Sequence, residues 1–413
     1  MITIAPIARA LVPVDDEAAA RISARNYDEF QGDREIWSAI RRRPDSVLAV
    51  TMAHCDVESV AAIGEGDSEP SLRRAAGNME RLRASPLTAE ARGVLFIYEI
   101  VGPARPGVRQ IGLGGLARTD EIRTESNPHG SIVRNEGVRE PKARGRARLI
   151  EATGAIIGMV NNAVPDARGE LAALLEREAD SRSPDLTSEA EDGYTHRVWL
   201  IEDPGRQGEL TGTLAAQPEA YVADGNHRSA AAAMLGREHF LAVFFPLDRM
   251  GIEPYNRLLE GVDASAAGER MLAANFEVRS PNGGAGYQPQ RGVELGLYVS
   301  GPGWRVLEPR PGSYDEGDAA ASVAHGVAQR LLFSAVLGID DAADARIRYV
   351  GADRDADWLA AEVDAGRAAA AVTLAPVTMA QFAEVCRQGG MMPPKSTWFV
   401  PKVRSGLVMA LLD

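Results

Sequence analysis

The stretch Tyr221-Val222-Ala223-Asp224-Gly225-Asn226-His227-Arg228-Ser229-Ala230 decides the fold of this chain. An apolar, β-prone segment from 219 to 223 leads into Asp-Gly-Asn, and an alanine-rich run from 230 to 235 follows it. This order predicts a strand, a tight turn and the start of a helix, because Gly225 can adopt the backbone torsions that a tight turn requires. Asp224 or Asn226 is expected to cap the first helical turn.

The chemistry of this turn predicts an anion site. Backbone amides at a helix start and the positive end of the helix dipole attract anions, most often phosphate. His227 and Arg228 add two side chains that can carry positive charge, and Gly225, Asn226 and Ser229 complete the predicted binding turn. The alternative is an ordinary capped helix with a His-Arg pair on its surface.

Composition and charge set the class of protein. The 413 residues suffice for a large core, in two or three domains or in one large domain. The 45% hydrophobic and 25% charged content is typical of soluble globular proteins. A net charge of −13 makes a nucleic-acid partner unexpected, because phosphate backbones require clustered lysine and arginine. It still allows a small anionic ligand in a local basic pocket.

The two cysteines, Cys55 and Cys386, are far apart and have no CxxC spacing, so no disulfide framework or zinc motif is indicated. The segment 47–51 reads as a buried strand followed by His54, Cys55 and Asp56. Side chains alternate along a strand, so these three consecutive residues are not expected to face one metal ion. Without a leader or an apolar run of about 20 residues, a cytoplasmic protein with no membrane span is expected.

Strands and helices interleave along the chain, which predicts an α/β or α+β fold with mixed sheets. The division expected is a nucleotide-binding core at 1–280 with an N-terminal extension, and a C-terminal α/β part at 281–413. A glycine-rich segment at 282–286 is interpreted as a flexible loop. Further segments expected are strands at 1–13, 93–101, 109–118, 197–201, 240–245, 293–300, 305–307, 348–351 and 370–374, and helices at 71–85, 171–179, 319–337, 356–365 and 379–387. A turn entering a helix is expected at 254–258.

Three further places carry candidate site residues. Asp28 lies in the polar turn 26–30, where it reaches a ligand, caps the helix that begins near Glu35, or supports the turn. Arg134 and Glu136 lie in the basic window 126–148, which forms either a second phosphate-facing wall or a solvated helix face. Lys395 follows two prolines in an extended tail, and it either reaches an anionic ligand or is an exposed strand lysine.

The order of these segments resembles the family known as domain of unknown function 1015, over nearly the whole chain. The stretches that carry the resemblance are 26–28, 134–136, 196–200, 223–228, 254–257, 392–397, 401–402 and 405–407. The central stretch also resembles the Asp-Gly-(His/Asn)-His-Arg signature of the ParB-like and sulfiredoxin-like superfamily, which includes free-serine kinases. The resemblance implies a ParB/sulfiredoxin-like core that binds ATP or ADP at His227 and Arg228, together with Mg²⁺.

The resemblance implies a small-molecule kinase acting on the hydroxyl of a serine-like amino acid or a similar metabolite. Asp224 would support magnesium or orient His227, and Asp28 or Glu136 would accept the hydroxyl proton. Sulfiredoxin chemistry requires a cysteine just before the His-Arg pair, where this chain has Asn226. The alternatives are a non-catalytic nucleotide-binding regulator and a ParB-like DNA-associated switch. The sequence leaves open whether the chain forms a homodimer.

Overall fold

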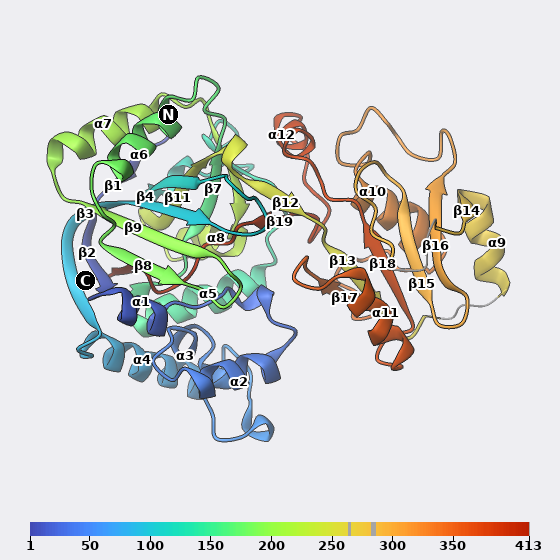
Figure 1. The fold of residues 1–413 in the computed structure, drawn as a ribbon, viewed down its shortest axis with the longest axis horizontal. Coiled ribbons are helices and arrows are strands. Elements are labelled where there is room, and N and C mark those ends of the chain that lie inside the picture. Colours follow the sequence, from blue (N-terminus) through green and yellow to red (C-terminus); the bar gives the residue numbers. More distant parts are fainter. Residues whose placement is uncertain (263–265, 282–285, 413) are drawn as a thin grey trace. The chain divides into compact units, whose positions relative to one another are not determined.

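The computed structural model of the protein describes residues 1–262, 266–281 and 286–412. The chain divides into two compact units (Figure 1). The first unit comprises Met1–Arg134, Val138–Met250 and Pro401–Asp413, and the second comprises Asn135–Gly137 and Gly251–Val400. The division expected at residue 280 stays a prediction; in the structure, the chain passes between units near residues 134–138, 250 and 400. Most of the predicted loop 282–286 lies outside the described residues.

The fold is α/β with mixed sheets, as the sequence predicts. The described strands of the first unit form a twelve-stranded sheet. Nine of them follow the order β5-β10-β7-β11-β4-β3-β2-β20-β6, and the other three, β1, β8 and β9, pair with β4, β9 and β3. These strands are β1 (Ile4–Ala5), β2 (Ile7–Pro13), β3 (Thr88–Val101), β4 (Gln110–Arg118), β5 (Ile132–Arg134), β6 (Ala155–Ile156), β7 (Val160–Val164), β8 (Leu186–Glu189), β9 (Thr195–Ile201), β10 (Ala220–Asp224), β11 (His239–Pro246) and β20 (Met409–Leu411).

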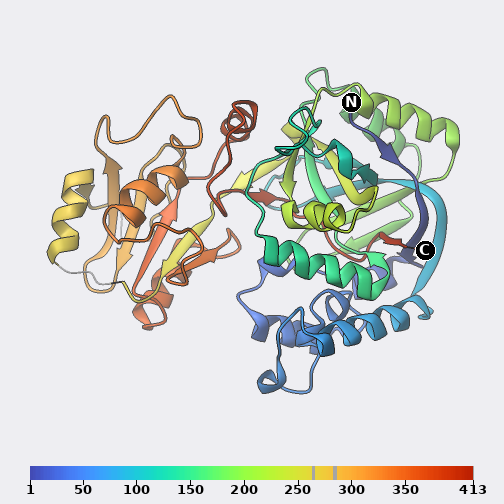
Figure 2. The same ribbon diagram turned by 180° about the vertical axis from the view of Figure 1, so that it is seen from behind.

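Helices cover this sheet and bury its apolar side chains. They are α1 (Asp16–Ile22), α2 (Asp33–Arg42), α3 (Leu48–Thr51), α4 (Glu69–Arg83), α5 (Glu140–Thr153), α6 (Glu170–Asp180), α7 (Pro204–Ala215) and α8 (Asn226–Met234). Figure 2 shows α5 and α8 in front of the sheet, and α5 also packs against α4. Local signals place several of these helices; Asp15, for example, accepts the backbone NH of Ala18 at 2.8 Å and caps α1.

The second unit is built on a six-stranded antiparallel sheet with the order β14-β16-β15-β18-β13-β17, among the residues that the structure describes. A separate two-stranded ribbon pairs β12 with β19. The elements are β12 (Gly251–Glu253), β13 (Asn256–Leu259), α9 (Ala266–Asn275), β14 (Phe276–Arg279), β15 (Leu295–Val299), β16 (Gly303–Pro309), α10 (Ala324–Val327), β17 (Ile347–Val350), α11 (Ala356–Asp364), β18 (Ala370–Leu374), α12 (Met379–Arg387) and β19 (Trp398–Val400).

Three predicted elements are wrong in type or length. The segment 47–51 is buried but contains the helix α3 instead of a strand, since a short apolar run does not distinguish the two. The turn and helix expected at 254–258 are replaced by β13, which is buried between β17 and β18. The long helix expected at 319–337 is reduced to α10, which continues as a π-helical segment over Ala328–Ser334.

None of the described helices combines the length and the apolar character that crossing a bilayer requires.

Candidate functional site

The predicted strand, turn and helix are present as β10, Gly225 and α8. Gly225 has φ +109°, a backbone conformation that favours glycine, and it is the N-cap of α8. The expectation that Asp224 or Asn226 caps the helix is wrong: no side chain among the described residues forms that hydrogen bond. The carboxylate of Asp224 instead forms an ion pair with Arg228. The helix start is thus left without a side-chain cap.

Arg228 lies in a narrow passage between two glycines. Its Nη2 is 3.0 Å from Oδ2 of Asp224, and the two side chains are only 19% and 23% exposed. A β-carbon added to Gly225 would lie 2.9 Å from Arg228 Nε, and one added to Gly158 would lie 3.0 Å from Arg228 Cδ. The position of the guanidinium therefore depends on the absence of side chains at both glycines.

The other predicted residues of the turn make contacts within the first unit. The imidazole Nε2 of His227 accepts the backbone NH of Arg139 at 3.1 Å, so in this arrangement the ring is neutral and keeps its proton on Nδ1. The hydroxyl of Ser229 is fully buried and donates to the carbonyl of Asn226 at 3.1 Å. In this contact His227 is therefore a hydrogen-bond acceptor and not a second cation.

Arg134 ends β5 beside the turn. β5 and β10 run parallel with Arg134 opposite Val222, so both strands end at the same edge of the sheet, where ligands of α/β folds commonly bind. The Nε of Arg134 is buried and has no hydrogen-bond partner among the described residues. Burial also lowers the pKa of Arg134 from its ordinary value. A buried donor without a partner costs free energy, which an anionic ligand would recover.

Arg146, which the sequence analysis did not single out, connects two predicted parts of the site. It projects from α5, and its guanidinium lies 4.7 Å from the ring centre of Tyr27. Burial lowers the pKa of Arg146 from its ordinary value. Tyr27 and Asp28 oppose that shift, and the positive charge of Arg228 adds to it. Arg146 therefore lies between the turn that carries Asp28 and the start of α8. Its only sequence signal was membership of the basic window.

Asp28 lies in a short 3-10 helix, Tyr27–Glu29, and is almost buried. Its Oδ2 is 3.8 Å from Nζ of Lys402, and these side chains are 12% and 8% exposed. The neighbouring Glu29 is also buried, and its Oε1 accepts the backbone NH of Asn26 at 2.7 Å. Burial raises the pKa of Glu29 to about 7, against the opposing charges of Arg404 and Lys402. A carboxyl group with a pKa near neutral is typical of sites that handle protons.

A buried hydrogen-bond network holds Arg404, whose positive charge opposes the rise in the pKa of Glu29. Arg404 donates from its backbone NH to the hydroxyl of Tyr98 at 2.9 Å and from Nε to His196 Nε2 at 3.4 Å. Nδ1 of His196 lies 2.8 Å from the Tyr98 hydroxyl. Burial, and then the charge of Arg404, hold the pKa of His196 well below its ordinary value. The neutral His196 is thus a structural residue that positions Arg404.

Glu136 and Lys395 belong to the second unit. The backbone NH of Lys395 donates to Oε1 of Glu136 at 3.2 Å, and Lys395 has the unusual φ of +56°. Nζ of Lys395 lies 5.4 Å from the ring centre of Tyr255, and the buried Arg257 lies in the field of Glu136. The structure therefore brings these two predicted residues together, whereas Asp28, Arg134 and the turn at 224–229 share the first unit.

A cavity of about 280 Å³ lies elsewhere in the first unit. Its lining includes Arg25, Phe30, Arg43, Asp192 and Arg404. Neither Asp28 nor any residue of the turn at 224–229 is among the described residues that line it. This cavity is therefore not the phosphate site that the sequence predicts.

Comparisons with known proteins give one matching family model and several similar solved structures. The model of a family described as "Protein of unknown function (DUF1015)" matches residues 4–331. None of the curated proteins matches the chain significantly. The chain is similar to a conserved hypothetical protein from Pyrococcus furiosus. The likeness covers 70% of this chain and 92% of that protein, with 13% identity and a TM-score of 0.38. A free serine kinase in complex with AMP is similar over 70% of this chain and 87% of its own, with 12% identity and a TM-score of 0.38. SbnI with a C-terminal truncation, from Staphylococcus aureus, has 11% identity and a TM-score of 0.38 over 69% of this chain and 82% of its own.

Proposed function

This chain belongs to the DUF1015 family, and we propose that it is a nucleotide-dependent small-molecule kinase. It would transfer a phosphoryl group from ATP or ADP to the hydroxyl of a serine-like amino acid or a similar metabolite. The observation that carries this proposal is the packing of α5 against α8, which brings the positive charge of Arg146 into the field of Arg228 at the start of α8. Two partly buried guanidinium groups repel each other, and a bound polyphosphate removes that cost.

The charges of the first unit support an anionic ligand. Arg134, Arg146, Arg228 and Lys402 supply four cationic side chains, whereas Asp28 and Asp224 supply two carboxylates. This local excess of positive charge contrasts with the net charge of −13 for the whole chain. Because an overall acidic protein repels anions, such a concentration is best explained by a phosphate-bearing ligand.

The residues of the turn would hold the phosphates. Arg228 and Arg146 would contact phosphate oxygens, and the backbone amides at the start of α8 would add donors. His227 would donate from Nδ1, and Gly225 lets the chain approach the ligand closely. The choice of a serine-like acceptor comes from the resemblance of the 223–228 stretch to the free-serine kinases.

Asp28 would accept the proton of the acceptor hydroxyl. Its carboxylate is kept close to Lys402 and to the field of Arg146, which favours the ionised form needed for a base. As the new oxygen–phosphorus bond forms and the bond to the leaving nucleotide breaks, the hydroxyl proton would move to Asp28. The roles predicted for Glu136, Ser229 and Lys395 stay predictions.

Magnesium fits the site through Asp224. Mg²⁺ is usually bound by one or two carboxylates together with phosphate oxygens and water, and Asp224 is the carboxylate at the end of β10. A bound Mg²⁺ would neutralise phosphate charge. The ion pair between Asp224 and Arg228 would continue to orient the Arg228 side chain while the same carboxylate holds Mg²⁺.

A direct assay tests the proposal. The purified chain would be incubated with γ-labelled ATP or β-labelled ADP, Mg²⁺ and a panel containing serine, threonine, homoserine and glycerol. Label transferred to a hydroxylated acceptor would support the kinase. Nucleotide binding without transfer to any acceptor would favour the non-catalytic regulator instead, and a lack of nucleotide binding would contradict the assignment of the turn.

A further inference from the structure

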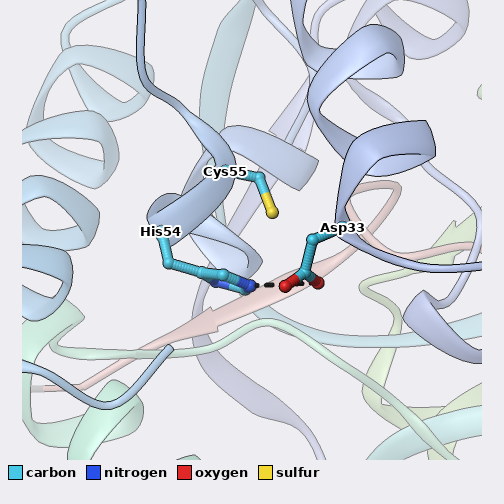
Figure 3. Close-up of side chains that lie close together, drawn as sticks. All are labelled: Asp33, His54 and Cys55. Carbon is cyan, nitrogen blue, oxygen red and sulfur yellow. Dashed lines mark hydrogen bonds and ion pairs between the residues drawn. The ribbon is translucent and has the colours of Figure 1, made fainter. Parts of the chain in front are cut away.

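A second group of chemically active side chains lies in the N-terminal part of the first unit. His54 and Cys55 lie on a 3-10 helix, Ala53–Cys55, and Asp33 is the first residue of α2. Figure 3 shows the three side chains pointing toward one another. One potential ligand atom from each lies within 4.8 Å of the others.

The tertiary structure creates this group. The alternation of side chains along a strand argues against a metal at 54–56, but the segment is helical. Asp56 takes no part, because its Oδ2 accepts from Asn78 Nδ2 at 2.8 Å. Asp33, more than twenty residues earlier in the chain, supplies the carboxylate instead.

The spacing of one pair of ligand atoms fits a metal ion. His54 Nε2 and Asp33 Oδ1 are 3.4 Å apart, which is beyond the ordinary range for an N–H···O hydrogen bond. Zinc–nitrogen and zinc–oxygen bonds at tetrahedral angles place the two ligand atoms about 3.4 Å apart. The pair therefore already has the spacing of one edge of a tetrahedral site.

Burial and chemistry point to the same class of metal. Cys55 is fully buried, His54 is 8% exposed, and the Asp33 side chain is 52% exposed, which leaves a path from solvent. A thiolate, an imidazole and a carboxylate are the ligands that zinc takes in proteins. Three such ligands leave a fourth position for water.

We infer that Asp33, His54 and Cys55 bind one zinc-class divalent cation. Binding releases the Cys55 thiol proton to solvent and forms bonds from the metal to Sγ, Nε2 and a carboxylate oxygen. The ion would fix the start of α2 to the loop that follows α3, where Trp37 Nε1 already donates to the carbonyl of Val57 at 2.9 Å. This role is independent of the proposed nucleotide site, because none of the three residues belongs to it.

The test is metal binding by the reduced, full-length chain after treatment with a chelator. Titration with Zn²⁺ alone should show one tight equivalent, and Co²⁺ should give the near-ultraviolet absorption of a cobalt–thiolate bond. Cys55→Ala should abolish that absorption, while Cys386→Ala, which changes the other buried cysteine, should retain it. Asp33→Asn changes an exposed side chain, so the variant should fold, and it should weaken Zn²⁺ binding about 100-fold or more.

Thermal unfolding gives a second readout. Zn²⁺ should raise the melting temperature of the unaltered chain and of Cys386→Ala, but not that of Asp33→Asn. Absence of a stoichiometric Zn²⁺ equivalent in the unaltered chain would overturn the inference. Equal Zn²⁺ affinity in the unaltered chain and in Asp33→Asn would overturn it as well, since binding would then occur elsewhere.

Discussion

The side chain of Arg228 passes Gly158 so closely that a β-carbon at position 158 would lie 3.0 Å from Cδ of the arginine. Gly158 precedes β7, so the guanidinium proposed to hold phosphate is positioned by a neighbouring segment of the sheet as well as by Asp224. The position of the Arg228 guanidinium therefore depends on Gly158, a residue that is assigned no contact with the proposed ligand.

Gly158→Ala should weaken nucleotide binding without removing any charge. The added methyl group would displace Arg228 and cost about 1 kcal/mol or more of binding free energy, measured by titration calorimetry. Gly77→Ala is the matched control, because a β-carbon on that helical glycine would meet nothing within 4 Å. Equal nucleotide affinity in the two variants would show that the position of Arg228 does not matter.

Arg228→Ala should weaken nucleotide binding by about 1.5–3 kcal/mol, the range for a hydrogen bond to a charged group. The substitution also leaves the partly buried Asp224 without its partner, which adds repulsion toward phosphate. Arg168→Ala is the control, because that side chain is 76% exposed and forms an ion pair with the neighbouring Glu170. Unchanged affinity of the Arg228 variant in calorimetry would remove the assignment.

Arg146→Ala should weaken nucleotide binding, whereas Arg144→Ala on the same helix should not. Arg146 contacts the ring of Tyr27 and lies in the field of Arg228, while Arg144 is 68% exposed and pairs with Glu140 one turn away. We expect a loss of about 1.5–3 kcal/mol for the first variant and less than about 0.5 kcal/mol for the second. Similar losses in both would indicate a diffuse electrostatic effect and not a site at Arg146.

Asp28→Asn should lower turnover by about 100-fold or more and leave nucleotide affinity nearly unchanged, since removal of a general base affects mainly the chemical step. The comparison variant is Glu136→Gln, the other carboxylate that the sequence suggests. The rate of label transfer at saturating nucleotide, measured for both variants, shows which of the two carboxylates is the base. Full rates in both variants would place the base on another residue.

Glu29 should make the stability of the first unit fall as the pH rises. Its pKa is about 7 when folded, against an ordinary value of 4.5. Below the ordinary pKa the group is protonated in both states; between the two values only the unfolded chain loses its proton, so unfolding becomes easier. The loss is complete above about pH 7 and is on the order of 3 kcal/mol.

Urea unfolding between about pH 4 and about pH 8 measures this effect. Glu29→Gln should lack the decline that the unaltered chain shows, because an amide does not titrate. Glu140→Gln, at a side chain that is 67% exposed, should follow the unaltered chain. Parallel pH profiles for the unaltered chain and Glu29→Gln would mean that the carboxyl group ionises normally in the folded protein.

Errors in the sequence-based prediction occurred where local patterns have two solutions. The apolar run at 47–51 suits a strand or a buried helix, and packing against α4 selects the helix α3. The cap of α8 is another case. Asp224 and Asn226 are both good capping residues, but Arg228 engages Asp224 once the helix has formed. Competition between partners cannot be read from spacing alone.

The sequence by itself determined the strand, the turn and the helix at 220–234, because apolar periodicity, the torsional freedom of Gly225 and the alanine run act within a few residues. Only the tertiary structure decided which distant side chains meet. Packing of α5 places Arg146 against Tyr27 and in the field of Arg228, and the 3-10 helix at 53–55 places Cys55 beside Asp33. Such contacts arise when apolar faces are buried against each other, and local propensity carries no information about which faces will do so.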